Sequence, residues 1–274
     1  SSTTRIGVEN PCFREAINTF LLADAEVVPH PVDEEGIVLN ERPCDYYYVT
    51  PGHQVPTGVT MSSARRRQLL EHAARHDAVI IEDDYDSESN FTLNPLPALK
   101  ASDRSGRVVY VSSLSKALSP GLRLGFMVAD PDLIDEARAL RRLVYRHPPT
   151  NIQYQMAHFL AQGHYETHLR RYHYDSAQRW ERLHAALQRY LPSCRALAGS
   201  EHANAFWLQT PAQINTQQLT WRAAHAGVLI EPGARHFLSA APPDNYFRMG
   251  FHAINPDAIA QGVEVLRGQL EQMG

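Results

Sequence analysis

Residues 112–125 read SSLSKALSPGLRLG, and they contain one of the two lysines in a 274-residue chain that carries 26 basic side chains. Lys116 lies three residues after Ser113 and seven before Arg123. A lysine amine can lose its proton and attack a carbonyl to form an imine, whereas arginine stays charged. A serine hydroxyl and an arginine fork are groups that bind phosphate well. This combination predicts that the chain binds pyridoxal phosphate.

A second polar segment, residues 80–86 (IIEDDYD), follows a candidate buried strand. Ligands of open α/β sheets bind at the carboxyl ends of strands, where Asp83 and Tyr85 would stand. A carboxylate can keep a pyridine nitrogen protonated, and a tyrosine hydroxyl can bond the ring oxygen. Taken alone, the segment also fits a solvated acidic loop or a metal-binding cluster. Together with Lys116 it favours the cofactor.

Arg248 interrupts an apolar stretch at residues 246–251 (YFRMGF). A charge in such a strand should be paired or functional. Its planar fork matches an amino-acid carboxylate, so we expect Arg248 to bind the carboxylate of a ligand. An internal salt bridge is the alternative.

In the first half, short apolar runs alternate with amphipathic stretches, which predicts an α/β fold with a mostly parallel sheet. The expected strands are residues 5–8, 27–29, 46–49, 78–82, 108–111 and 124–128, with helices at 62–75 and 131–143. A long helix from about residue 164 leads into a smaller α+β region, with strands at 205–209, 228–231 and 246–250 and a closing helix. We therefore expect a large domain at residues 1–165 and a small domain at 166–274.

The composition and charge of the chain exclude several classes of protein. The chain is 43% hydrophobic and 20% charged, as in ordinary globular proteins, and no apolar run approaches the ~20 residues that span a bilayer. Cys12, Cys44 and Cys194 form no CxxC, so we expect no disulfide framework and a reducing cytoplasm. The net charge of −4 argues against duplex DNA binding by this segment. We expect the arginines at 65–67, 141–142 and 170–171 to lie on solvated helix faces.

Two rival sites can be weighed from the sequence. The run from Ser113 to Lys116 also fits the S-x-x-K pattern of penicillin-binding hydrolases, which requires a later K-T-G. The other lysine, Lys100, is followed by Ala101, which excludes that motif. Histidine pairs at 72/76 and 164/168 have zinc-like spacing but lack the H-E-x-x-H glutamate, so we expect no metal. Gly227 and Gly233 are interpreted as turn glycines.

Six motifs occur in a fixed order: residues 50–58 (TPGHQVPTG), 82–88 (EDDYDSE), 113–116 (SLSK) with Arg123, 147–149 (HPP), 163–171 (GHYETHLRR) and 248–251 (RMGF). Over essentially its whole length, the chain resembles the aminotransferase-like domain of MocR-type transcriptional regulators in the GntR superfamily. The resemblance implies fold type I of the pyridoxal phosphate enzymes, with a large α/β domain and a smaller C-terminal α+β domain.

The resemblance also implies roles for single residues: Lys116 forms the internal aldimine, Asp83 contacts the pyridine nitrogen, Tyr85 the ring oxygen, Ser113 and Arg123 the phosphate, and Arg248 an effector carboxylate. Phe13 falls where the family commonly has a tyrosine that stacks on the cofactor ring. We therefore expect the stacking to remain and the hydroxyl contact to be lost.

Two functions use these residues in different ways. As a sensor, the domain binds an amino-compound effector by transimination at Lys116 and signals to a DNA-binding domain. As an enzyme, it is an amino acid:2-oxo acid aminotransferase in which Lys116 moves the substrate proton. Aminotransferases of this fold usually carry Asn-Pro-x-Gly, whereas Val55 precedes Pro56 here. This favours a sensor with weak or no transaminase activity; γ-aminobutyrate, taurine, a D-amino acid and pyridoxal phosphate itself are all compatible effectors.

The resemblance implies further partners. It predicts a cytoplasmic homodimer whose neighbouring subunit completes each site, and DNA contact through an N-terminal winged-helix domain. That domain and the family's upstream phosphate loop are absent from this sequence, so we expect an N-terminally truncated fragment.

Overall fold

The computed structural model describes residues 3–40, 42–86, 88, 96–197 and 204–273. A seven-stranded sheet has the order β3-β2-β1-β4-β5-β6-β7. Its strands are β1 (Arg5–Asn10), β2 (Glu26–Asp33), β3 (Gly36–Ile37), β4 (Tyr46–Val49), β5 (Val79–Asp84), β6 (Val108–Ser113) and β7 (Gly125–Val128). The strands from β2 to β6 in this order are parallel, and the edge strands β3 and β7 are antiparallel. The predicted mostly parallel sheet is confirmed.

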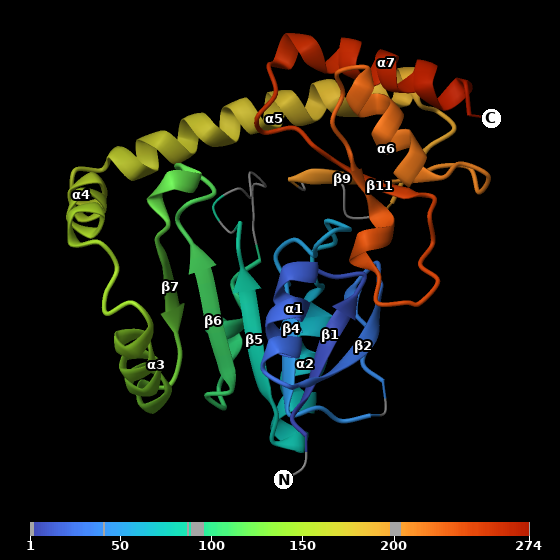
Figure 1. The fold of residues 1–274 in the computed structure, drawn as a ribbon. Helices are drawn as coiled ribbons and strands as arrows, with labels where there is room; N and C mark the ends of the chain where they lie inside the picture. The colour runs from blue at the N-terminus through green and yellow to red at the C-terminus, as the bar shows by residue number, and fades with distance from the viewer. Residues whose placement is uncertain (1–2, 41, 87, 89–95, 198–203, 274) are drawn as a thin grey trace.

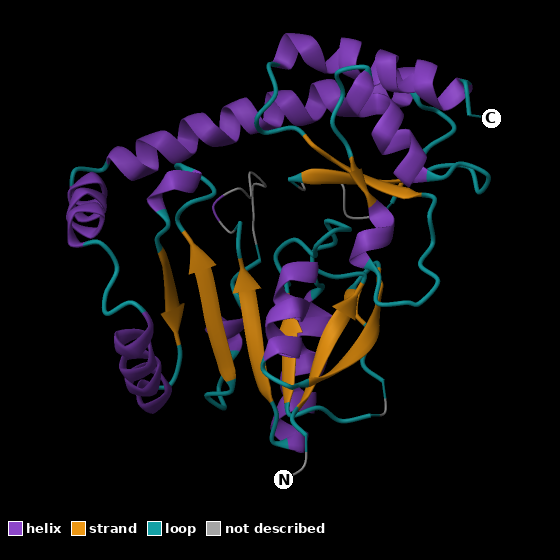
Figure 2. Cartoon of the chain, in the orientation of Figure 1, coloured by secondary structure: helices purple, strands orange, loops and turns teal. Residues whose placement is uncertain are grey.

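Helices α1 (Arg14–Leu22) and α2 (Ser63–His76) cover opposite faces of this sheet (Figures 1 and 2). Successive side chains of a strand point to opposite faces. On β4, Tyr47 accordingly belongs to the hydrophobic cluster that includes Leu69 of α2. The next residue, Tyr48, belongs to the cluster that includes Ile17 of α1. Both faces of the sheet are therefore buried, as a parallel sheet requires.

The second half contains a four-stranded antiparallel sheet, in the order β10-β11-β9-β8, whose hydrophobic core is shared with residues 183–191, 219–223 and 259–270. Its elements are α3 (Pro131–Val144), α4 (Thr150–Ala161), α5 (His164–Tyr190), β8 (Arg195–Ala196), β9 (Ala205–Gln209), α6 (Thr216–His225), β10 (Glu231–Pro232), β11 (Tyr246–Gly250) and α7 (Ile259–Glu271). Short 3-10 helices are η2 (Leu99–Ser102), η3 (Pro120–Leu122), η4 (Gly233–His236) and η5 (Pro256–Ala258). Helix α5 extends past both sheets (Figure 1). None of the described helices is long and apolar enough to cross a membrane.

The predicted elements are largely confirmed, with one displaced strand and several omissions. Residues 228–231 were expected to form a strand, but β10 covers Glu231–Pro232. Within this run Leu229 is 86% exposed, whereas Ile230 is buried in the core, so the run packs without forming a strand over its whole length. Helices α1, α4 and α6 were not predicted. The α/β architecture with a smaller α+β region is as expected.

The expectation that the arginine triplet is solvated is wrong for Arg66, which is buried. Its guanidinium donates to the backbone carbonyls of Met61 (2.9 Å), Pro97 (2.8 Å) and Pro51 (2.8 Å). Three backbone carbonyls outside the helices and strands thus provide acceptors for the buried guanidinium. Arg66 thus joins α2 to the loop that follows β4.

Of the two expected turn glycines, one has a different role. Gly227, two residues after the end of α6, has a φ of +85°, in the left-handed region that favours glycine. Gly233 instead permits close packing. A Cβ at this position would lie 2.6 Å from the Tyr246 carbonyl oxygen and 2.7 Å from the Trp207 ring. A side chain is therefore excluded because the backbone of β11 is too near.

We predict that Gly233→Ala lowers the free energy of unfolding by about 1–3 kcal/mol, the usual cost of overpacking. Gly268→Ala is the matched control, because nothing lies within 4 Å of a Cβ at Gly268 and alanine favours the α7 helix. It should raise stability by up to ~1 kcal/mol. Urea denaturation measures both, and equal effects of the two substitutions would contradict the packing account.

Candidate functional site

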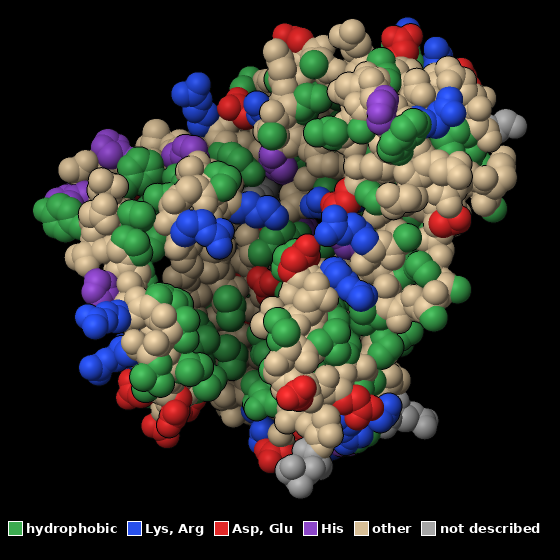
Figure 3. All heavy atoms as spheres, in the orientation of Figure 1, with side chains coloured by type: hydrophobic (Ala, Val, Ile, Leu, Met, Phe, Trp, Pro, Cys, Tyr) green, Lys and Arg blue, Asp and Glu red, His purple; other side chains and the backbone are tan. Residues whose placement is uncertain are grey.

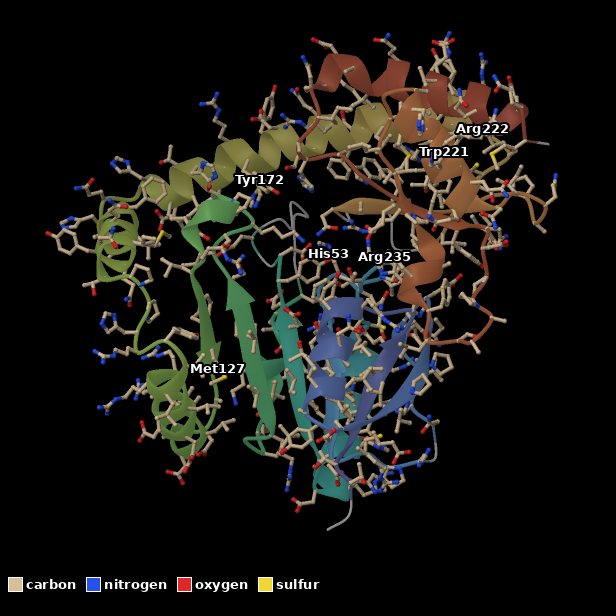
Figure 4. All side chains as sticks on the ribbon, in the orientation of Figure 1. His53, Met127, Tyr172, Trp221, Arg222 and Arg235 are labelled. Carbon is tan, nitrogen blue, oxygen red and sulfur yellow. The ribbon has the colours of Figure 1, made fainter. Side chains whose placement is uncertain are left out.

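The candidate site lies at one edge of the large sheet. Carboxyl ends of parallel strands meet at the same edge. The segments that follow β1, β4, β5 and β6 accordingly bring Phe13, His53, Tyr85 and Lys116 to this edge. Figure 4 shows His53 there, beneath the C-terminal part of the chain. Four segments far apart in the sequence thus contribute to one region.

Lys116 faces a cavity of about 900 Å³ whose lining also includes Asn204, Arg248 and His252. Figure 3 shows basic and acidic side chains around a hollow between the sheet and the C-terminal part. The Lys116 Nζ lies 4.0 Å from the centroid of the Tyr85 ring. The Lys116 side chain is accessible to solvent from the cavity. The surrounding protein nevertheless removes water from the amine, and this desolvation, together with the positive charge of Arg248, lowers the pKa of Lys116. A lowered pKa leaves more of the amine neutral, as imine formation requires.

Asp83 lies near the end of β5 and accepts a hydrogen bond from the Tyr48 hydroxyl. Burial raises the pKa of Asp83, and the bond from Tyr48 opposes this rise. The charge of Lys116 also favours the ionised carboxylate. The sequence identified Asp83 but not its tyrosine partner.

A buried polar network surrounds Tyr85. Its hydroxyl donates to the His53 carbonyl oxygen (3.1 Å) and accepts from the Asn204 amide (3.3 Å). The same amide donates to Asp86, whose carboxylate pairs with His53 Nδ1 at 2.9 Å. Burial acts to lower the pKa of His53, but the charge of Asp86 raises it overall. Sequence reasoning gave no role to Asp86 or Asn204, although Asp86 is part of a quoted motif.

Arg248, on β11, forms the internal ion pair that was the alternative expectation for it. Its guanidinium donates to Asn204 Oδ1 and to Glu231 Oε2, each at 3.4 Å. Arg248 also lines the cavity with Lys116. The two bonds are long and sit at the weak end of hydrogen-bond geometry. A ligand carboxylate could therefore compete for this guanidinium.

The two residues expected to bind a phosphate, Ser113 and Arg123, flank the loop that carries Lys116. Ser113 ends β6 and pairs in the sheet with Gly125, two residues after Arg123. The Ser113 hydroxyl accepts the Ser115 amide hydrogen at 3.2 Å. Arg123 has a φ of +50° and is exposed, and within the described part of the chain its side chain makes no hydrogen bond or ion pair. The structure thus brings Lys116 together with Asp83, Tyr85 and Arg248 but shows no contact between Ser113 and Arg123.

Phe13 stands at the N-terminus of α1, three residues after the end of β1. Its side chain is 38% exposed. An exposed aromatic ring at the carboxyl edge of the sheet is available to stack on a planar ligand. Its placement is compatible with the role that the resemblance implied.

Glu9 is a buried acid that the sequence did not single out. Its Oε2 accepts from the Thr50 amide (3.2 Å), the Thr50 hydroxyl (2.7 Å) and the Gln54 amide (3.4 Å). Its Oε1 has no hydrogen-bond partner among the described residues. Burial raises the pKa of Glu9 from 4.5 to about 7. Glu9 therefore fastens β1 to the loop that carries His53.

These groups fit pyridoxal phosphate by their chemistry. The site offers an amine with a lowered pKa, a buried carboxylate for a ring nitrogen, a tyrosine hydroxyl and an exposed arginine for a phosphate. Among the described residues, no cluster of three or more histidine, cysteine or acidic side chains could hold a metal ion.

Comparison with known proteins agrees with this chemistry. The profile of aminotransferase class I and II matches residues 49–266. The chain is 37% identical over 263 residues to the HTH-type transcriptional regulator TauR of Rhodobacter capsulatus, covering 94% of this chain. It is 34% identical over 264 residues to the probable rhizopine catabolism regulatory protein MocR of Rhizobium meliloti, covering 95%. The matches cover 54% and 53% of these relatives, so the chain spans about half their length.

Among solved structures, the kynurenine aminotransferase of Pyrococcus horikoshii in complex with PMP is similar with a TM-score of 0.90 at 26% identity. The match covers 99% of this chain and 70% of that chain. The fold is that of the fold-type I pyridoxal phosphate aminotransferases, as expected. The predictions of a regulator-type relative and of pyridoxal phosphate as the cofactor of this family are confirmed.

We predict a pH-dependent stability difference between the wild type and Glu9→Gln. Folding raises the pKa of Glu9, so the folded protein favours the protonated carboxyl group. The stability that protonated Glu9 contributes is therefore lost as the pH rises through about 7 and the carboxyl group ionises. The wild type should lose about 2 kcal/mol relative to Glu9→Gln between about pH 5.5 and about pH 8.5. Urea denaturation at both pH values measures this change. A constant difference would show that Glu9 does not titrate in this range.

Proposed function

This chain belongs to the aminotransferase class I and II family, and we propose that it is the effector-binding and dimerisation domain of a MocR-type regulator of the GntR superfamily. The observation that carries the proposal is the shared cavity of Lys116 and Arg248. An amine and a carboxylate-binding fork on one cavity suit a ligand that carries both an amino group and an acid group. The regulators among its relatives supply the regulatory part of the proposal.

In this proposal, seven side chains hold the cofactor and the effector, with the roles that the resemblance implied. Bound pyridoxal phosphate supplies an aldehyde carbon that reacts with amines. Asp83 keeps the ring nitrogen protonated, Tyr85 bonds the ring oxygen, and Ser113 and Arg123 hold the phosphate. Phe13 stacks on the ring. Lys116 is the amine that leaves when the effector amine takes its place by transimination.

Arg248 then orients the effector. Its guanidinium binds a carboxylate or sulfonate in place of the long bond to Glu231. Because Arg248 also bonds Asn204, and Asn204 bonds Asp86 and Tyr85, the anionic group joins a network that reaches the large sheet. We infer that effector binding changes the relation between the two sheets through these contacts.

The remaining parts of the proposal concern the whole protein. We propose a cytoplasmic homodimer in which DNA is bound by an N-terminal winged-helix domain, as the regulator relatives suggest. The domain division at residues 165 and 166 is kept as part of this proposal; it falls in the first turn of α5.

A catalytic aminotransferase is the second candidate function. The similarity to the kynurenine aminotransferase favours it, since an enzyme would use the same lysine and arginine. Val55, where aminotransferases of this fold usually have asparagine, favours the sensor. The difference between the two functions lies in whether Lys116 moves a proton after the effector amine has bound.

A half-transamination assay tests the proposal. In the full-length protein loaded with pyridoxal phosphate, amino compounds should change the absorbance of the lysine-bound cofactor, with little conversion to pyridoxamine phosphate. Lys116→Ala, the control, should abolish the original band because the amine that bonds the cofactor is gone. Conversion to pyridoxamine phosphate at ordinary turnover rates would instead establish the enzyme.

We predict that Arg248→Gln weakens binding of effectors that carry a carboxylate or sulfonate by about tenfold or more, because a charge-assisted bond is lost. Cofactor affinity should stay within about twofold of the wild type, since Arg248 is expected to contact the effector rather than the cofactor. Absorbance titrations measure both constants. Arg235→Gln is the control, because Arg235 also bonds Glu231 but is not among the cavity-lining residues. Equal loss of cofactor and effector affinity would mean that Arg248 is structural.

A further inference from the structure

The hydroxyl of Tyr48 is a buried polar group next to the proposed cofactor site. It donates a hydrogen bond to Oδ2 of Asp83. Among the described residues, no other side chain or backbone amide donates a hydrogen bond to this carboxylate. Tyr48 is 5% exposed, so solvent does not substitute for its hydroxyl.

The sheet register places these two side chains together. Tyr48 of β4 is the partner of Ile81 of β5 in the parallel ladder. Asp83 follows two residues later and therefore points to the same face as Ile81. On this face the Phe20 ring of α1 packs edge-on against the Tyr48 ring, with centroids 5.4 Å apart. The tyrosine ring is thus held on one side by the helix and at its hydroxyl by the carboxylate.

We propose that Tyr48 is a positioning residue for the cofactor ring nitrogen. Its hydroxyl occupies one oxygen of Asp83, fixes the plane of the carboxylate and leaves Oδ1 for the ring N–H. The assignment rests on the proposed function, because it requires pyridoxal phosphate at this site. Tyr48 itself touches neither the reacting atoms nor the effector in this arrangement.

The charges around Asp83 explain why a donor is needed there. Burial and the neighbouring carboxylates of Asp84 and Asp86 disfavour the ionised form of Asp83, while Tyr48 and Lys116 favour it. Once Lys116 is bonded to the cofactor, its nitrogen no longer carries the same charge. The Tyr48 hydroxyl then becomes the more important of the two groups that favour the ionised form of Asp83. Without that hydroxyl, Asp83 would tend to keep a proton and could no longer accept the ring N–H.

The neighbouring tyrosine provides a matched control. Tyr47 is as deeply buried, and its hydroxyl also makes a hydrogen bond, at 2.7 Å to His72 Nε2. It lies on the opposite face of the sheet, in the cluster that includes α2. Tyr47→Phe therefore removes a buried hydroxyl from the same strand without touching Asp83.

The test compares Tyr48→Phe, Tyr47→Phe and the wild type in the full-length protein. Titration with pyridoxal phosphate gives the dissociation constant, and cofactor labelled with ¹⁵N at the ring gives the protonation state of that nitrogen by NMR. Tyr48→Phe should raise the dissociation constant by about tenfold, since a bond to a charged group is lost, and move the ¹⁵N signal towards that of unprotonated pyridine. Tyr47→Phe should change neither.

Different failures have different meanings. An unchanged ¹⁵N signal in Tyr48→Phe overturns the assignment, even if affinity falls, because a purely structural residue would act on affinity alone. Failure of the wild type to bind pyridoxal phosphate through Lys116 overturns the proposed function and this assignment with it. If Tyr48→Phe does not fold, the wild type still decides: the Tyr48 hydroxyl proton should shift in NMR when the cofactor binds, and a signal that does not move rejects the proposal.

Discussion

The parallel pairing of β1, β4, β5 and β6 is the constraint on which the site depends. Backbone hydrogen bonds in a parallel ladder force all four strands to run in one direction, so their carboxyl ends share an edge. Residues as distant in sequence as Phe13 and Lys116 are thereby delivered to one region. The smaller antiparallel sheet then adds Asn204 and Arg248 from the other side of the cavity.

A network of charged and polar side chains connects the two sheets. Asp86, after β5, is bonded by His53 and by Asn204, while Asn204 also accepts from Arg248 of β11. Removing one member would leave a charge buried without compensation, which is more costly than the loss of an exposed pair. A ligand that takes over Arg248 therefore acts on a connected set of contacts and not on one side chain.

Removal of water by the surrounding protein also adjusts the protonation of groups in and beside the proposed cofactor site. It lowers the pKa of Lys116 and raises those of Asp83 and Glu9. For Lys116 this favours the neutral nucleophile, whereas for Asp83 it opposes the ionised state that the proposed contact with a ring nitrogen requires. Hydrogen bonding from Tyr48 offsets this effect for Asp83. The same low-polarity surroundings thus help one residue and require a compensating donor for the other.

The sequence alone determined the cofactor chemistry and most of the strands. Lys116, Asp83 and Arg248 could be found because their side-chain types are unusual where they occur, and apolar periodicity marks strands before any packing is known. Tyr48, Glu9 and Arg66 lie in stretches whose residue types are ordinary for a strand or a helix surface. Only the tertiary structure decided their roles, because hydrogen-bond partners and burial depend on which segments pack against them. For the same reason residues 228–231 were predicted to be a strand: apolar composition is local, whereas strand pairing depends on the neighbouring segments, and β10 covers only Glu231–Pro232.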